Sequence, residues 1–195
     1  MLSIRPICTI TPPGLTAADA ACRVAATQLL GGKEGGGFKN AMMTLDRARP
    51  GVAAQALGLA QGALEWALRY TSERRQFGQT VMSHQAIQFK LAELVAEVDL
   101  ARHYNYACAQ AILDDADPLT ITKMASIAKL KAGRLQREVP DWCMQFHGGI
   151  GYVEETWTAR YFRDARLLSI GGGADEVMLG IIAKIEGIFP QGGAG

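Results

Sequence analysis

Two long apolar stripes with helical spacing constrain the fold of this 195-residue chain more than any other feature. Apolar residues that recur every three or four positions fall on one face of an amphipathic helix. The sequence therefore predicts two long helices, each burying one face, with a break between them at residues 114–118. The first stripe is Ile87, Leu91, Leu94, Val98 and Ala101; the second is Ile121, Met124, Ala128, Ala132, Leu135, Val139, Trp142 and Phe146.

An earlier helix is predicted over residues 52–73, which are rich in Ala, Leu and Gln. Pro50 suits its first turn, where a missing N–H costs nothing, and Phe77-Gly78 ends it. Ser83 is a candidate N-cap for the helix that carries the first stripe. Pro140 falls inside the second stripe, so we expect a kink or a break just before it.

The C-terminal part predicts a tight loop at 147–152, a shorter helix over 155–168 and an interruption at 170–174. Asp175 is expected to cap a last helix that reaches about Ile188. Long helices with short connections predict an all-α fold, an antiparallel four-helix bundle over residues 38–188. No alternating strand pattern follows residue 38, so we expect no sheet there. We expect residues 1–37 to be an irregular segment that ends in a glycine-rich hinge and residues 189–195 to be a flexible tail.

Composition excludes several classes of function. Hydrophobic residues make up 49% of the chain, which is the proportion of an ordinary globular protein. The formal charge of +1 offers no basic surface for nucleic acid. No apolar run approaches the ~18 residues of a transmembrane segment, and the N-terminus is a poor signal peptide. The cysteines are far apart, which predicts free thiols in a reducing, cytoplasmic compartment; they are Cys8, Cys22, Cys108 and Cys143.

Most catalytic motifs are absent from the sequence. No Glu-x-x-His pair or G-x-S-x-G motif occurs, and Asp99 with His103 is interpreted as a hydrogen-bonded surface pair rather than a metal site. The glycine loops at 148–151 and 171–173 could let a flat ligand approach the backbone between helices. The segment 74–77 combines two arginines, an amide and an aromatic ring. These arginines either complement a helix dipole or bind a phosphate.

Six motifs, in this order, closely resemble the C-terminal helical domain of acyl-CoA dehydrogenases. The resemblance covers roughly residues 38–188. The motifs are Leu45-Asp46-Arg47-Ala48-Arg49-Pro50, Ala60-Gln61-Gly62-Ala63-Leu64, Ser72-Glu73-Arg74-Arg75-Gln76-Phe77-Gly78, His84-Gln85-Ala86-Ile87-Gln88, Gln145-Phe146-His147-Gly148-Gly149-Ile150-Gly151-Tyr152 and Arg163-Asp164-Ala165-Arg166.

The resemblance implies FAD-dependent α,β-dehydrogenation of an acyl-CoA thioester, in which a carboxylate removes the α-proton and a hydride passes to FAD. It implies a homo- or hetero-oligomer with another acyl-CoA dehydrogenase subunit, with electron-transfer flavoprotein as a further partner. The segment 74–77 would reach the cofactor of a neighbouring subunit. Asp46 and Arg49 would hold the CoA moiety, and Gly173 would lie against the substrate. The residues expected to contact FAD are Arg74, Gln76, Phe77, Gln85, Gln145, Gly148 and Gly149, with Ala174 and Glu176 at positions whose usual residues differ.

Two departures from the family pattern concern the catalytic base. The family's glutamate falls at Gly172 or, in other members, at Ala48, and neither residue carries an acid here. The acids nearest in sequence are Asp46, Asp175 and Glu176.

Only residues 24–31 resemble the end of the family's middle β-domain, so we expect a truncated subunit. Three hypotheses follow from these departures. The chain is active with a partner chain, or it is an inactive gene fragment, or it is a helical interaction or CoA-binding module without redox function.

Overall fold

A computed structural model describes residues 2–3, 23–24, 27, 30–32 and 35–188. The chain divides into two compact units, Met1–Leu45 and Asp46–Gly195. In the first unit, β1 (Leu2–Ser3) pairs antiparallel with β2 (Arg23–Val24), and a 3-10 turn, η3, spans Leu30–Gly32. Cys8, Cys22 and the tail predicted at 189–195 lie outside the described residues.

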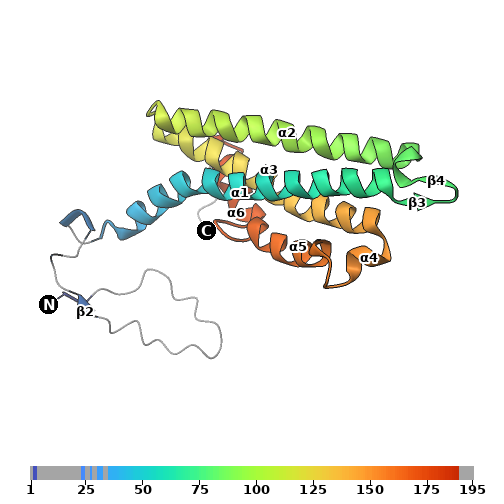
Figure 1. Ribbon diagram of the computed structural model, residues 1–195. Coiled ribbons are helices and arrows are strands. Elements are labelled where there is room, and N and C mark those ends of the chain that lie inside the picture. Colours follow the sequence, from blue (N-terminus) through green and yellow to red (C-terminus); the bar gives the residue numbers. More distant parts are fainter. Residues whose placement is uncertain (1, 4–22, 25–26, 28–29, 33–34, 189–195) are drawn as a thin grey trace. The chain divides into compact units, whose positions relative to one another are not determined.

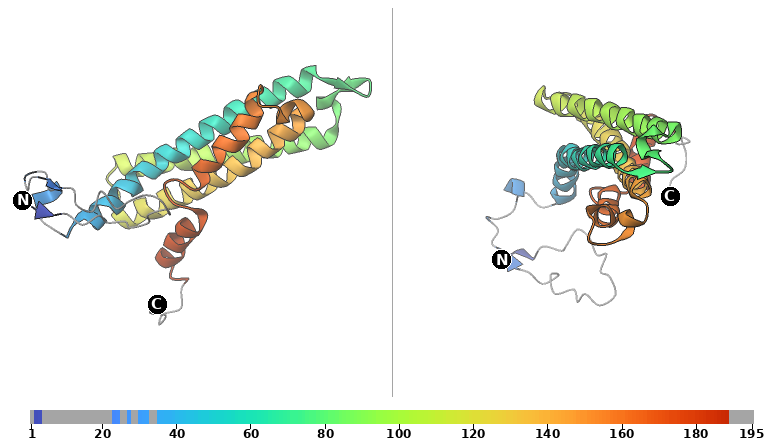
Figure 2. Two further views of the ribbon diagram at one scale, coloured as in Figure 1. Left: turned by 90° about the horizontal axis from the view of Figure 1, so that it is seen from below. Right: turned by 45° about the vertical axis from the view of Figure 1, so that its right-hand side comes forward.

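The second unit is built almost entirely from helices, as predicted. Its successive long helices run antiparallel, and α5 returns along α3, which confirms the all-α bundle (Figures 1 and 2). The last helix, α6, also packs on α3. The elements are α1 (Gly37–Glu73, which begins in the first unit), β3 (Arg75–Gln76), β4 (Gln79–Thr80), η4 (Val81–Ser83), α2 (Gln85–Leu113), α3 (Pro118–His147), α4 (Gly149–Tyr152), α5 (Trp157–Ala165), η5 (Arg166–Ser169) and α6 (Asp175–Ile185).

The core of the bundle combines small residues of α1 with the two predicted stripes. Leu94 and Val98 of α2 and Val139 of α3 are fully or almost fully buried. Burial of the apolar side chains of α1 together with the two stripes stabilises the bundle. The buried alanines of α1 are Ala53, Ala56, Ala60, Ala63 and Ala67.

Pro50 and Pro140 both lie inside helices, so the predicted start of the first helix was wrong, and of the kink or break predicted at Pro140 the break does not occur. The first helix begins at Gly37, not near Pro50, and α3 runs across Pro140 without a break. Each proline removes one backbone hydrogen bond, but both rings are buried, and tertiary packing of the surrounding face outweighs that loss. Asn105 also donates from Nδ2 to the carbonyl oxygen of Pro50 at 3.1 Å.

Two predicted helix caps were also wrong. His84 is the N-cap of α2, while Ser83 lies in the preceding 3-10 turn and its Oγ lies 2.8 Å from Oγ1 of Thr80. Ala174 is the N-cap of α6, because the carboxylate of Asp175 binds arginines of α3 instead of its own backbone. This last helix ends at Ile185, short of the predicted Ile188.

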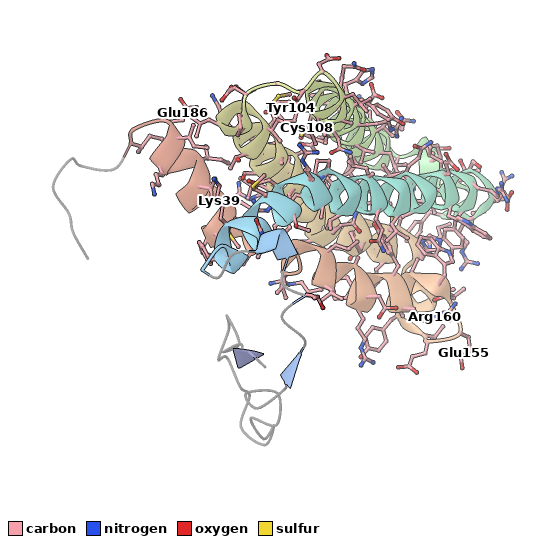
Figure 3. All side chains as sticks on the ribbon, turned by 90° about the vertical axis from the view of Figure 1, so that its left-hand side faces the viewer. Lys39, Tyr104, Cys108, Glu155, Arg160 and Glu186 are labelled. Atoms are coloured by element: carbon pink, nitrogen blue, oxygen red, sulfur yellow. The ribbon has the colours of Figure 1, made fainter. Side chains whose placement is uncertain are left out.

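Three short elements refine the predicted connections. Residues 75–80 form a small hairpin, although no sheet was expected after residue 38. Within 147–152, Gly148 takes a φ of 61° and the helical turn α4 follows it. The predicted helix over 155–168 begins at Trp157 and ends in the 3-10 turn η5. Figure 3 shows Arg160 near Glu155 at the outer face of this segment, where its guanidinium donates to the Glu154 carbonyl at 2.6 Å.

None of the helices in the described part of the chain is long and apolar enough to cross a membrane.

Candidate functional site

A buried ion pair in α1 is the centre of a polar cluster within the bundle. Arg49 is 3% exposed and its Nη1 binds the carboxylate of Asp46. The other oxygen of that carboxylate accepts from Oγ1 of Thr122 in α3 at 2.7 Å. Arg49 also donates from Nε to the carbonyl oxygen of Gly172 at 3.1 Å. The cluster therefore ties α1 and α3 to the glycine loop before α6.

That loop, residues 171–174, has an unusual backbone. Gly172 has a φ of 73° and Gly173 a φ of 125°, conformations that side-chain-bearing residues rarely adopt. A Cβ at Gly173 would lie 2.5 Å from Cε of Met178, but that atom ends a flexible side chain that can shift, so the φ of 125° is the main reason for glycine there. A Cβ at Gly172 would meet only Cγ2 of Val52 at 3.7 Å and Cε of Lys129 at 4.0 Å. The positive φ, rather than a steric clash with neighbouring side chains, is therefore the reason for glycine at position 172.

Asp175 begins α6 directly after the loop. Its carboxylate accepts hydrogen bonds from Nε of Arg134 at 3.1 Å and from Nη2 of Arg137 at 2.6 Å. Burial alone would raise the pKa of Asp175, but the two guanidinium groups lower it overall. Its neighbour Glu176 is exposed.

Neither expected base position offers a proton acceptor. Ala48 lies exposed on α1 beside Arg49, and Gly172 lies in the loop. Two of the three nearest acids already have partners: Asp46 binds Arg49 and Thr122, and Asp175 binds two arginines. Within the part of the chain that the structure describes, Glu176 forms no ion pair.

The hairpin between β3 and β4 lies beyond the end of α1 (Figure 1). Phe77 at its tip is 94% exposed and has a φ of 52°, followed by Gly78 with a φ of 82°. Positive φ at both central residues is typical of the type I′ turn of two-residue hairpins. Arg74, Gln76 and Gln85 are exposed around it, and neither Arg74 nor Arg75 has an ion-pair partner among the described residues.

The C-terminal end of α3 lies at the same end of the bundle as the hairpin. Tyr70 donates from its hydroxyl to the carbonyl oxygen of His147 at 3.3 Å, and the two rings stack with centroids 4.2 Å apart. Figures 1 and 2 show α4, which follows, at this end. The three predicted cofactor residues here are all exposed; they are Gln145, Gly148 and Gly149.

The predicted site residues thus form two separate groups. Residues 49 to 73 of α1 span about 36 Å at ~1.5 Å per helical residue. One group lies near Arg49 and contains Asp46, Gly173, Ala174 and Glu176. The other group lies near the hairpin and contains Arg74, Gln76, Phe77, Gln85, Gln145, Gly148 and Gly149.

The two cysteines of the bundle are buried, and a histidine–aspartate pair lies on its surface. Burial raises the pKa of the Cys143 thiol to about 12 and also raises that of Cys108. His103 and Asp99 lie exposed on α2, with Nδ1 of the histidine 2.9 Å from the Asp99 carbonyl, as the surface-pair interpretation predicts. The described residues hold no group of three or more candidate metal ligands.

Sequence reasoning missed three polar residues of the first group, namely Lys129, Thr122 and Asn105. Lys129 is 1% exposed, and its Nζ donates to the carbonyl oxygen of Gly173. A signal existed, because this lysine directly follows the stripe residue Ala128 and has small residues on either side along the helix. Thr122 and Asn105 gave no such signal, since their partners lie 76 and 55 residues away.

Comparison with known proteins decides the family. The model of the family described as "Acyl-CoA dehydrogenase, C-terminal domain" matches residues 35–186. The chain belongs to the acyl-CoA dehydrogenase family. Probable acyl-CoA dehydrogenase YngJ of Bacillus subtilis is 44% identical over 162 residues, which are 83% of this chain and 42% of that protein. Caffeyl-CoA reductase-Etf complex subunit CarC of Acetobacterium woodii is 40% identical over 147 residues, which are 75% of this chain and 38% of that protein.

A solved acyl-CoA dehydrogenase has the same fold. The butyryl-CoA dehydrogenase structure from Megasphaera elsdenii matches with a TM-score of 0.75 and 41% identity, over 78% of this chain and 39% of that one. The chain therefore spans about two fifths of the length of these three relatives. Acyl-CoA dehydrogenases depend on FAD, and their C-terminal domain contacts that cofactor.

The hairpin group fits such a cofactor by its chemistry. An exposed aromatic ring can stack on a flat heterocycle, and the adjacent arginines can bind phosphate oxygens in a bidentate manner. Gly148 and Gly149 leave open space beside them, because a Cβ at either position would meet nothing within 4 Å.

Proposed function

We propose that this chain forms the FAD-contacting C-terminal part of an acyl-CoA dehydrogenase that acts on an acyl-CoA thioester. The observation that carries this proposal is the division of the family motifs between the two ends of one bundle. A polar cluster with a glycine loop lies at one end, and at the other lies an exposed ring beside arginines that form no ion pair among the described residues. FAD, when bound, supplies the hydride acceptor for oxidation of the Cα–Cβ bond.

The hairpin group would bind the phosphates and adenine of FAD through Arg74, Gln76 and Phe77. Gln85, Gln145, Gly148 and Gly149 would line the same cofactor. About 36 Å of helix separates this group from Arg49, which supports the implication of the family resemblance that the hairpin would reach the FAD of a second subunit. The exposure of Phe77 supports this assignment, since an isolated chain gains nothing from a 94% exposed ring.

The Arg49 group would position the acyl-CoA. Asp46 and Arg49 would hold the CoA moiety, and the backbone of Gly173 would lie against the thioester. Ala174 and Glu176 would contact the flavin. A half-buried glycine loop beside a helix N-terminus allows close approach of a substrate to backbone N–H groups.

The α-proton needs an acceptor that neither Gly172 nor Ala48 can supply. General-base assistance contributes ~10²- to 10⁴-fold to a rate, so without a substitute acid the chain would support binding better than turnover. For this reason a non-catalytic helical interaction module, a CoA-binding module and an inactive gene fragment remain the alternative functions.

We further propose that the protein works in the cytoplasm as a homo- or hetero-oligomer and passes electrons to electron-transfer flavoprotein. The buried thiols Cys108 and Cys143 suit a reducing compartment. The formal charge of +1 gives no reason to expect nucleic acid as a partner.

The visible absorption spectrum of the purified chain, loaded with FAD and freed of excess cofactor, tests this function. We expect a flavin spectrum that bleaches on anaerobic addition of butyryl-CoA if an acid substitutes for the glutamate. A bound flavin that stays oxidised would mean that the chain binds the cofactor without dehydrogenating butyryl-CoA. A chain that takes up no FAD would contradict the proposal for the chain alone.

A matched pair of variants makes the test specific to the hairpin. Arg74→Ala should weaken FAD binding about 10- to 100-fold, because a charge-assisted hydrogen bond is worth ~1.5–3 kcal/mol. Arg47→Ala removes an exposed arginine at the other end of the bundle and should leave FAD binding unchanged. Equal losses from both variants would show that the hairpin is not the binding site.

A further inference from the structure

Lys129 of α3 is a buried cation without a buried anion of its own. Its side chain is 1% exposed, and no carboxylate lies within ion-pairing distance of Nζ among the described residues. Its Nζ instead donates to the carbonyl oxygen of Gly173. Burial lowers the pKa of this amine, and the nearby charge of Asp175 only partly offsets that effect. Burying a lysine without a carboxylate partner costs desolvation free energy, which its hydrogen bonds must offset.

The partner of Lys129 is the loop at the expected base position. Arg49, from a different helix, donates to the carbonyl oxygen of Gly172. Two buried cations, one from α1 and one from α3, therefore bind two consecutive carbonyl groups of the loop. Both glycines have positive φ, so the loop is not a regular helix, although the N–H of Gly173 donates to the carbonyl oxygen of Ile170 at 3.3 Å. The side-chain donors of Arg49 and Lys129 hold the two carbonyl groups of Gly172 and Gly173.

We propose that Lys129 is a positioning residue, which fixes the Gly173–Ala174 peptide so that this loop presents its backbone to an acyl thioester. The assignment of the thioester to this loop rests on the proposed function. The fixation itself rests on the hydrogen bond and the burial alone. Lys129 is not itself a base for the α-proton, because its amine is buried and directed to a carbonyl oxygen.

Hydrogen exchange of the loop amides, followed by NMR, tests the proposal on the whole chain. Lys129→Met keeps the length of the side chain and removes its donor. We expect the amides of residues 171–176 to exchange at least 10-fold faster, while those of Leu94 and Val98 in the buried face of α2 stay unchanged. Lys131→Met, an exposed lysine on the same helix, should change neither set.

A second variant separates positioning from a merely structural role. Lys129→Gln keeps a neutral donor and should restore slow exchange in the loop at least in part. The proposal is overturned if Lys129→Met leaves the loop amides unchanged, or if it accelerates Leu94 and Val98 equally. It is also overturned if neither Lys129 variant folds, because the lysine would then serve the whole bundle.

Binding of butyryl-CoA to the same proteins tests the proposed function separately. We expect Lys129→Met to bind it at least 5-fold more weakly than the unchanged chain, with Lys131→Met unaffected. Failure of the unchanged chain to bind butyryl-CoA would contradict the proposed function and leave the exchange result standing for the fixation of the loop. Faster exchange without weaker binding would overturn the link between the fixed loop and the thioester.

Discussion

Arg49 donates from Nε to the carbonyl oxygen of Gly172, a residue 123 positions later in the chain, at 3.1 Å. The same guanidinium binds Asp46 one helical turn earlier in α1. The first motif of the family is thereby joined directly to Gly172, one of the two positions where the family resemblance predicts a catalytic glutamate. Through this contact, Arg49 can fix the position of a loop that is distant in sequence.

Arg49→Met should lower the free energy of unfolding by about 3 kcal/mol, because it leaves the half-buried carboxylate of Asp46 without its cation. Urea denaturation monitored by circular dichroism measures this change. Arg47→Met is the control, since Arg47 is exposed two positions earlier on the same helix and its loss should stay within about 0.5 kcal/mol. Equal effects of the two variants would contradict a special role for the buried arginine.

Restoring a glutamate should affect stability differently at the two base positions. Gly172→Glu forces a side chain onto a φ of 73° and should lower the free energy of unfolding by about 1–3 kcal/mol. Ala48→Glu places the same acid on an exposed helical position and should stay within about 0.5 kcal/mol. Thermal unfolding monitored for the two variants and the unchanged chain measures this difference in stability.

Turnover in the FAD-loaded protein is the second measurement on these variants. A rise in butyryl-CoA oxidation with either glutamate would show that the base was the limiting deficiency. If neither variant raises turnover, the absent acid is not what limits the chain.

The helices could be predicted from the sequence because apolar spacing reports burial directly. Leu91, Leu94 and Val98 are buried as their spacing requires. The prolines misled the prediction, because local rules place Pro50 and Pro140 at helix boundaries, whereas buried tertiary contacts hold both inside helices.

The candidate site was only partly predictable. The motif around Asp46 and Arg49 could be recognised in the sequence. The hydrogen bonds from Thr122 to Asp46 and from Arg49 to Gly172 could not, because they join residues 76 and 123 positions apart. Such polar contacts leave no periodic pattern, since each residue is placed by the packing of whole helices. Asp175 shows the same limit: its sequence context suggests a cap, and only the fold brings two arginines to it.

Asp175 should make stability depend on pH at the acidic end. Its pKa in the folded chain is lowered from 3.8, so ionised Asp175 stabilises the fold at neutral pH, and this stabilisation is lost as the pH falls through the lowered value. The difference in free energy of unfolding between the unchanged chain and Asp175→Asn should therefore shrink below about pH 4. Urea denaturation across this range measures it, and a pH-independent difference would contradict the assignment.

Cys143 should be unreactive in the folded chain. Burial both excludes reagents and raises the pKa of its thiol to about 12, so thiolate is scarce at neutral pH. Alkylation by iodoacetamide, located by peptide mass spectrometry, should be at least ~100-fold slower at Cys143 than in urea-unfolded protein. Rapid labelling in the native protein would show that the α3 face opens readily.

Phe77 offers a last prediction, which separates binding from folding. Its ring is 94% exposed and its φ is 52°, so the residue contributes strain without burying surface. Phe77→Gly should therefore keep or raise the free energy of unfolding, by up to about 1 kcal/mol, because glycine adopts this φ freely. The same change should weaken FAD binding, measured by fluorescence titration, since the stacking ring is lost. A variant that loses stability and retains full FAD affinity would show that the ring serves the hairpin rather than a cofactor.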